Sequence, residues 1–148
     1  MADGSNPTAR VPRAARLGQV TTSLFVYGTL MPGRLRWVLL DAVAVASRPD
    51  TVAGRLYDTG EGGPAARFHR PGGAEPLEAD GEGSIPGWVV EIDPGALGSL
   101  LPVLDEVETG FRRVRVRTGA GEQAWGYEVL ERQADWPAID RWDALEER

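Results

Sequence analysis

The chain has 148 residues, of which 42% are hydrophobic and 26% are charged, which suffices for one domain with its own hydrophobic core. It has no cysteine and a single histidine, His69, which excludes disulfides, thiolate chemistry, Cys-ligated zinc and a His-rich metal site. A net charge of −6 argues against nucleic acid and anionic membranes as partners.

The first 22 residues are expected to form a flexible tail. They contain arginines but no apolar stretch of the kind that a secretory signal needs. The whole sequence contains no run of 18 or more apolar residues, which argues against a membrane-spanning helix. We therefore expect a cytoplasmic protein whose residues 23–148 form a single domain.

The first half of the domain alternates strands with glycine-rich segments. Ser23–Tyr27 is apolar and rich in β-forming residues, which predicts a central strand. Residues 31–47 place leucine and valine at helical spacing and predict a short helix or an irregular turn. Thr51–Tyr57 predicts a second strand. Residues 60–84 hold much of the glycine and proline and predict a loop around one short strand, Ala65–His69.

One well-patterned helix follows a further strand at residues 85–92. Asp93 stands at the N-cap with Pro94 at the first helical position, which is the favoured order for a helix start. Four leucines at i, i+3, i+4 and i+7 predict a single apolar stripe: Leu97, Leu100, Leu101 and Leu104. Pro102 is expected to kink this helix or to split it into two turns.

The last third predicts a hairpin and a closing helix. Residues 111–117 alternate arginine with apolar side chains, and 122–130 form the predicted antiparallel partner after a glycine-rich turn. Residues 135–148 read as a short amphipathic helix that turns three side chains inward: Ile139, Trp142 and Leu145. The order of elements predicts an α+β fold with a mixed or antiparallel sheet that is able to close into a small barrel.

Chemistry is first suggested by the turn YGTL, where the strand Ser23–Tyr27 stops. Gly28 permits a positive φ or a close backbone approach by a ligand. The N–H groups of Gly28, Thr29 and Leu30 could then face an anion or a developing oxyanion. The alternative interpretation is a strand-to-turn junction at which glycine merely relieves strain.

A second candidate is the acidic segment LDEVETGF, at the end of the leucine-striped helix. Asp105 and Glu108 share a helix face and repel each other, and the helix C-terminus disfavours ionised acids. Both effects would raise a carboxyl pKa towards the range that suits a general acid or base. The alternative is a solvated acidic helix end that Arg112 and Arg113 neutralise. His69, in a Gly/Pro-rich loop, is a poor candidate for a Ser–His–Asp set.

Taken together, these pieces resemble the γ-glutamylcyclotransferase superfamily, and in particular its AIG2-like, γ-glutamylamine cyclotransferase branch. The matching motifs run in family order from Leu24 to Val129: YGTL, GRLYDTGEGGPAA, IPGWVVEID, LDEVETGF with its arginine, and AWGYEV. The resemblance implies a small mixed β-barrel with flanking helices that needs no cofactor and no metal. It also implies a reaction that cyclises a γ-glutamyl group to 5-oxoproline and releases the attached amine or amino acid.

The resemblance assigns roles to particular residues. Glu108 would be the catalytic glutamate, and five residues would bind the substrate: Tyr27, Gly28, Thr29, Leu30 and Phe111. The expected partner is a small γ-glutamyl amine or γ-glutamyl amino acid, and the expected state is a monomer or homodimer.

Two departures from the family pattern leave alternatives open. Thr109 separates Glu108 from Gly110, where the family has glycine directly after the glutamate, so Asp105 and Glu106 compete for the role of base. Phe111 stands where the family prefers tyrosine. Two other functions also stay open: a binding module of the same fold without turnover, and an interaction domain that uses tryptophan surfaces at Trp88, Trp125, Trp136 and Trp142.

Overall fold

The computed structural model describes residues 21–69 and 83–142. In chain order, these residues form β1 (Ser23–Val26), α1 (Val38–Asp41), β2 (Ala44–Asp58), β3 (Pro64–Phe68), β4 (Ser84–Ile92), α2 (Pro94–Val107), β5 (Phe111–Arg117), β6 (Gln123–Val129) and β7 (Ala138–Ile139). Most of the expected tail and most of the expected 60–84 loop lie outside the described residues.

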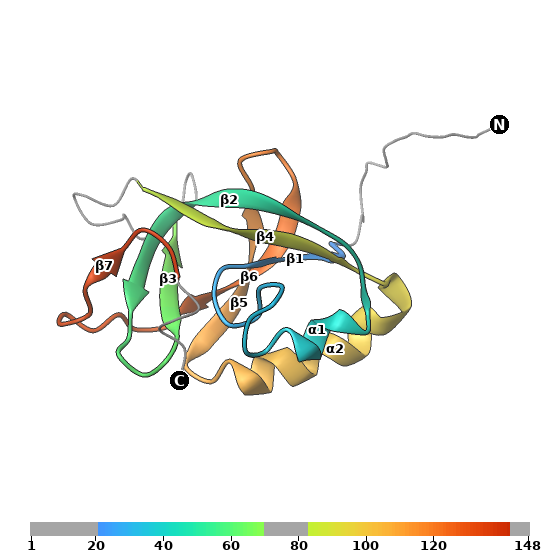
Figure 1. Cartoon of the computed structure of the whole chain (residues 1–148), viewed down its shortest axis with the longest axis horizontal. Coiled ribbons are helices and arrows are strands. Elements are labelled where there is room, and N and C mark those ends of the chain that lie inside the picture. Colours follow the sequence, from blue (N-terminus) through green and yellow to red (C-terminus); the bar gives the residue numbers. More distant parts are fainter. Residues whose placement is uncertain (1–20, 70–82, 143–148) are drawn as a thin grey trace.

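The strands form one mixed sheet that nearly closes into a barrel (Figure 1). Their order is β3-β2-β4-β1-β6-β5, and β7 pairs with β2. The central strand β1 is antiparallel to β4 but parallel to β6, where Leu24 lies opposite Trp125. This arrangement confirms the predicted α+β fold with a small mixed β-barrel and flanking helices.

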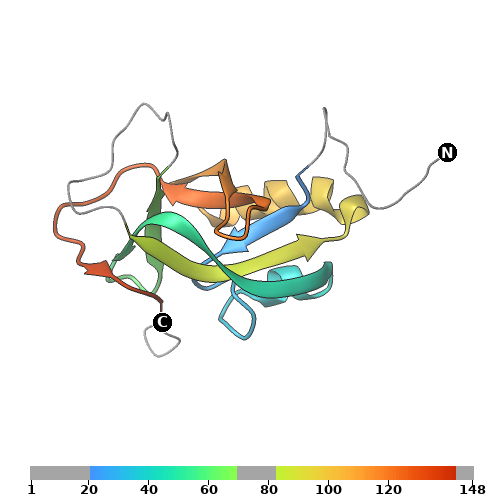
Figure 2. The ribbon, with the colours of Figure 1, turned by 90° about the horizontal axis from the view of Figure 1, so that it is seen from above.

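Strand β2 is longer than the sequence predicted and joins the two ends of the barrel. Residues 44–53 pair with β4, whereas residues 54–58 pair with β3 (Figure 2). The change of partner falls at Gly54. A Cβ at this position would lie 2.4 Å from the carbonyl oxygen of Arg67, which explains why the residue is glycine. The predicted strand began only at Thr51, because the exposed side chains of residues 45–47 show no alternating apolar face.

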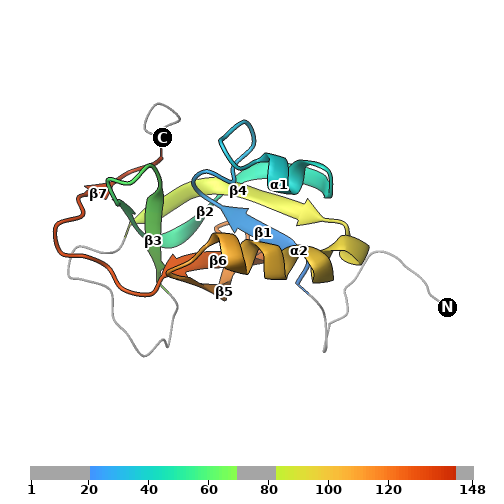
Figure 3. The same ribbon diagram turned by 90° about the horizontal axis from the view of Figure 1, so that it is seen from below.

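Both faces of the central strands are buried, which explains their unbroken apolar sequence. Leu24 and Val26 of β1 contribute to a core that lies against the helices. Phe25 and the following Tyr27 contribute to a second core inside the barrel. The two helices lie at one end of the molecule, and β3 and β7 lie at the other (Figure 3).

Helix α2 confirms the predicted leucine stripe. Leu97, Leu100 and Leu104 are buried, and Leu101 packs partly against the same core. The helix continues unbroken through Pro102, so the expected split into two turns is wrong. Asp93 occupies the N-cap, but its side chain makes no capping hydrogen bond.

The predicted C-terminal helix is wrong within the described residues. Residues 138–139 form β7, which pairs with Leu56 and Tyr57 of β2. The carbonyl of Pro137 accepts a hydrogen bond from the N–H of Asp58 at 3.0 Å, which holds this segment extended along the sheet. Trp142 is buried as expected, whereas residues 143–148, including Leu145, lie outside the described residues.

In the described parts of the chain, neither helix has the length and apolar character that crossing a bilayer requires.

Candidate active site

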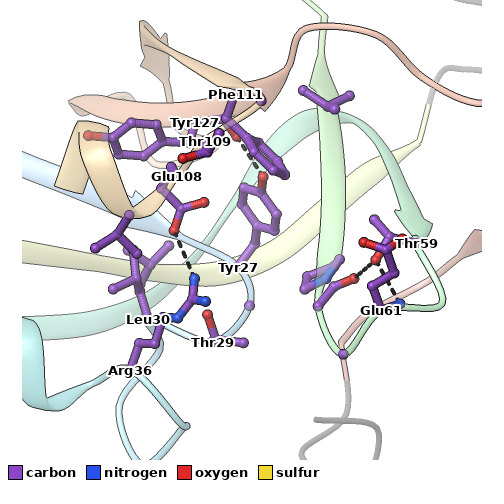
Figure 4. A pocket seen from close by; sticks show the side chains of 18 of the residues that line it. Tyr27, Thr29, Leu30, Arg36, Thr59, Glu61, Glu108, Thr109, Phe111 and Tyr127 are labelled. Carbon is purple, nitrogen blue, oxygen red and sulfur yellow. Dashed lines mark hydrogen bonds and ion pairs between the residues drawn. The ribbon is translucent and has the colours of Figure 1, made fainter. Parts of the chain in front are cut away.

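A cavity of about 580 Å³ opens between the end of α2, the turn after β1 and the loop before β3 (Figure 4). It is lined from five stretches of the chain: residues 25–30, 35–36, 59–64, 107–111 and 127–136. All six residues that the sequence nominated lie in this lining: Tyr27, Gly28, Thr29, Leu30, Glu108 and Phe111. The fold therefore brings together two motifs that are about eighty residues apart, although their roles stay predictions.

Glu108 is placed by the end of helix α2. It is the C-cap residue, with its N–H donating to the carbonyl of Leu104 at 2.9 Å and its own carbonyl accepting from the N–H of Phe111 at 3.0 Å. Its side chain turns into the cavity and is only 13% exposed. Burial raises the pKa of Glu108, and the nearby Arg36 guanidinium partly opposes that rise. Repulsion from Asp105, which the sequence suggested as a cause of a raised pKa, does not contribute to the rise at Glu108.

The extra residue Thr109 is absorbed in the turn after α2. Its hydroxyl donates to the carbonyl of Glu106 at 2.9 Å, and Gly110 follows at a φ of 89°. The carbonyl of Gly110 then accepts a hydrogen bond from the N–H of Leu130 at 2.9 Å. These contacts fix the turn, so the insertion leaves Glu108 facing the cavity.

The two competing acids point elsewhere. Asp105 accepts a hydrogen bond from the hydroxyl of Tyr127 at 2.6 Å and pairs with Arg113 at 3.4 Å. Glu106 is exposed to solvent, and neither carboxyl lines the cavity. The expected neutralisation by Arg113 is therefore present, whereas Arg112 pairs with Glu128 instead.

The turn after β1 lines the cavity and contains backbone donors without a partner in the described part of the chain. Among the described residues, the N–H groups of Gly28, Thr29 and Leu30 meet no acceptor. The carbonyls of the same turn are used internally: Gly28 accepts from the N–H of Met31 at 3.0 Å, and Thr29 accepts from the N–H of Arg36 at 2.7 Å. Three adjacent backbone donors without a partner are groups of the kind that can bind an anion or an oxyanion.

The structure gives a different reason for Gly28 from the one that the sequence suggested. Its φ is not positive. A Cβ at this position would lie 2.6 Å from Cγ and 2.8 Å from Cδ of Pro64, so the close approach is made by the first residue of β3. The glycine therefore lets β3 close against the turn.

Two aromatic side chains form walls of the cavity. Tyr27 is buried, and its hydroxyl donates to the carbonyl of Tyr127 at 2.6 Å, so that it is occupied within the protein. Burial raises the pKa of Tyr27, and the charge of Glu108 adds to the rise. Phe111 is half-buried at the start of β5. Both residues are thus placed to contact a bound molecule mainly through their rings.

Several lining residues were missed by the sequence reasoning. Arg36 lines the cavity but lies in a segment that the sequence predicts to be a helix or a turn, and it belongs to no recognised motif. The loop 59–63 and the segment 130–136 reach the cavity only because β2 and β7 bring them there. Tyr127 lies within the quoted AWGYEV motif, which was the only signal available for it.

Other sequence alternatives receive no support from the structure. Trp142 is buried, and Trp88 and Trp125 pack partly against the core, so these tryptophans do not form an exposed surface. Trp136 is half-buried and lines the cavity. His69 is exposed at the end of β3 and is not part of the lining. In the residues that the structure describes, no three metal-ligating side chains gather in one place.

Replacing Gly28 by alanine is expected to lower the free energy of unfolding by about 1–3 kcal/mol, because the added methyl group must displace the Pro64 ring. Urea unfolding followed by circular dichroism measures this change. Gly98→Ala is the matched control, since a Cβ there meets no atom within 4 Å and alanine favours a helix. Equal stability of Gly28→Ala and the wild type would contradict the Pro64 contact.

Comparison with known proteins identifies the family. Residues 24–144 match the model of the family described as "Gamma-glutamyl cyclotransferase, AIG2-like". Among curated proteins, no significant match is found.

Solved structures share the fold. An AIG2-like protein from Mus musculus has a TM-score of 0.61 and 17% identity, covering 84% of this chain and 90% of its own. An uncharacterized protein from Pyrococcus horikoshii has a TM-score of 0.57 and 23% identity, covering 81% and 86%. YkqA from Bacillus subtilis has a TM-score of 0.61 and 24% identity, and this chain, 83% of which aligns, spans only 40% of it. Because the family model spans most of the sequence, the chain belongs to the γ-glutamyl cyclotransferase, AIG2-like family.

Proposed function

We propose that this protein cyclises the γ-glutamyl group of a small substrate to 5-oxoproline and releases the attached amine or amino acid. The observation that supports this proposal best is the position of a buried glutamate, Glu108, in the same cavity as the three free N–H groups of the turn after β1. The volume of about 580 Å³ is in the range of small-molecule sites.

In this proposal Glu108 acts as general base and then as general acid. Its carboxylate takes a proton from the α-ammonium of the substrate, and the neutral nitrogen attacks the γ-carbonyl carbon of the same molecule. The resulting tetrahedral intermediate breaks its original C–N bond while Glu108 returns the proton to the departing nitrogen. The second proton that the ring nitrogen must lose leaves with the released amine, which departs as an ammonium ion. No water is consumed. The raised pKa of Glu108 brings the carboxyl closer to the working pH, which suits both proton transfers.

The turn after β1 supplies the second part of the chemistry. The N–H groups of Gly28, Thr29 and Leu30 would bind either the negative oxygen that develops on the γ-carbonyl or the α-carboxylate of the substrate. Aromatic walls from Tyr27 and Phe111 would hold the substrate in the folded shape that its intramolecular attack requires.

The test is direct. The purified protein is incubated with γ-glutamyl amino acids and γ-glutamyl amines, and 5-oxoproline together with the released amine is measured by mass spectrometry. We expect both products in equal amounts. Binding without turnover across the panel would instead favour a small-molecule-binding module of the same fold.

The pH dependence provides a separate prediction. Because burial raises the pKa of Glu108, kcat/KM should begin to fall at a pH above the usual glutamate value of about 4.3 as the solution is acidified. The ionised form is the active base, so activity is lost as pH drops through that pKa. A pH profile of kcat/KM measures the position of this limb. A limb at or below the usual value would contradict Glu108 as a buried base.

A further inference from the structure

Arg36 is an unassigned side chain in the cavity. Among the described lining residues it is the single cation, whereas three are carboxylates: Glu61, Glu108 and Glu131. Its backbone N–H donates to the carbonyl of Thr29 at 2.7 Å, which fixes it beside the turn that presents the free N–H groups. The side chain points towards Glu108 (Figure 4), and its Nη1 lies 3.8 Å from Oε2 of that residue.

The pair that Arg36 forms with Glu108 is loose. A separation of 3.8 Å exceeds the length of a hydrogen bond. Within the described residues, the guanidinium donates no hydrogen bond to any other group. The Arg36 side chain is also 45% exposed, so a molecule in the cavity can reach it. Its five donors are therefore available to a ligand that accepts in a planar, paired fashion.

A carboxylate beside a cation is the complement of an α-amino acid. The ammonium and carboxylate of such a group are attached to one carbon, so they present opposite charges a few ångströms apart. Glu108 can face the ammonium while Arg36 faces the carboxylate, with each charge in the site meeting its opposite. A carboxylate is also the planar acceptor that a guanidinium binds with two parallel hydrogen bonds.

We propose that Arg36 is a specificity-determining residue that binds the α-carboxylate of the γ-glutamyl group. This inference rests on the proposed cyclisation for its substrate. It also assigns separate roles within the cavity. Arg36 binds the α-carboxylate, and the N–H groups of Gly28, Thr29 and Leu30 bind the developing oxyanion. The enzyme then requires a γ-glutamyl group whose α-amine and α-carboxylate are both free.

The first experiment compares two substrates that differ at one group: a γ-glutamyl amine, and the same compound with its α-carboxylate converted to a carboxamide. Wild-type kcat/KM should be about 10- to 100-fold higher for the carboxylate, as expected for a charge-assisted hydrogen bond in the site. In Arg36→Gln this preference should fall to near unity, mainly by a loss on the carboxylate substrate. Arg36→Lys keeps the positive charge but loses the paired planar donors of the guanidinium, so it should retain part of the preference for the carboxylate substrate.

Arg117→Gln is the matched control. It removes the same charge from an exposed position outside the cavity and should leave the preference for the carboxylate unchanged. The backbone hydrogen bond from position 36 to Thr29 persists in every variant, so the turn keeps this anchor. Circular dichroism checks that each variant is folded.

A purely electrostatic effect on Glu108 predicts a different result. Arg36 opposes the rise in the pKa of Glu108, so its removal moves the acid limb of the pH profile to higher pH. If this were the whole role of Arg36, Arg36→Gln would slow both substrates by the same factor at a given pH. An unchanged carboxylate preference in Arg36→Gln would overturn the inference.

Binding of the product separates failure of this inference from failure of the proposed reaction. Calorimetric titration compares 5-oxo-L-proline with its carboxamide, and needs no turnover. We expect wild type to bind the acid at least about 10-fold more tightly, and Arg36→Gln to bind the two alike. If wild type binds the acid no better than the amide, or binds neither, the inference is wrong. If the protein forms no 5-oxoproline but binds the acid more tightly than the amide, and loses this preference in Arg36→Gln, the role of Arg36 stands and the proposed reaction is wrong.

Discussion

Replacing Glu108 by glutamine should lower kcat/KM for 5-oxoproline formation by about 10²- to 10⁴-fold, the usual contribution of a positioned general acid or base. The glutamine keeps the size of the side chain in the cavity but cannot take the proton of the α-ammonium. The KM should change less than kcat, because the lost interaction is made in the transition state of proton transfer and not in substrate binding. Steady-state kinetics with the best substrate of the panel measures both.

Two neighbouring acids provide matched controls for this variant. Glu106→Gln alters an exposed carboxyl on the same helix end, and Asp105→Asn alters one that is bonded to Tyr127 and Arg113 outside the cavity lining. Both should retain most of the activity. The free energy of unfolding of Glu108→Gln should be no lower than that of wild type near neutral pH, because the raised pKa means that the ionised carboxylate is disfavoured where it is buried. An active Glu108→Gln variant would show that the base is misassigned.

The largest effect on stability is expected at Glu128. This glutamate is 1% exposed in β6, with Oε1 accepting from the N–H of Phe68 in β3 at 3.1 Å. Its Oε2 accepts from Nε and Nη2 of Arg112 at 2.9 and 2.8 Å. In the described part of the chain no backbone ladder joins β3 to β6, so this carboxylate bridges the seam that leaves the barrel nearly closed.

Glu128→Ala should therefore lower the free energy of unfolding by about 3–5 kcal/mol, because it leaves an arginine without its buried partner and a strand N–H without an acceptor. Glu128→Gln keeps one acceptor and should cost less. Glu91→Ala is the matched control: Glu91 also lies in a strand and pairs with an arginine, Arg48, at 2.7 Å, but its side chain is 41% exposed. Such a pair contributes about 0–1 kcal/mol. Chemical unfolding of the three variants would refute the bridge if Glu128→Ala cost no more than Glu91→Ala.

The local pattern of apolar residues in the sequence predicted most of the helices and strands. The elements that it missed form because of pairing between strands that are distant in the sequence. The strand Ser23–Val26 and helix Pro94–Val107 are readable because their apolar side chains repeat with the period of the element. The first residues of β2 show no such pattern, since only their pairing with β4 makes them a strand. The segment 135–142 looked helical because its apolar residues are spaced by three, yet a partner on β2 decided its conformation.

The candidate site shows the same division. Glu108 and the turn at Gly28 could be nominated because each belongs to a recognisable motif, and the fold then places both in one cavity. Arg36 could not be nominated, since its significance depends on a 3.8 Å approach to a residue more than seventy positions away. The cause of the raised pKa of Glu108 was also misjudged, because burial is a property of the packed structure and leaves no trace in the spacing of charges.

Strand β5 ends the order of the sheet, and its position has a consequence for how copies of this protein meet one another. An outermost strand offers unpaired backbone groups on which a strand of another molecule can assemble, which is a common route to aggregation. The exposed residues of β5 are all arginines: Arg112, Arg115 and Arg117. Antiparallel stacking of two such edges would bring like charges face to face. The arginine-rich sequence of β5 would therefore oppose edge-to-edge pairing of two copies of this protein through this strand.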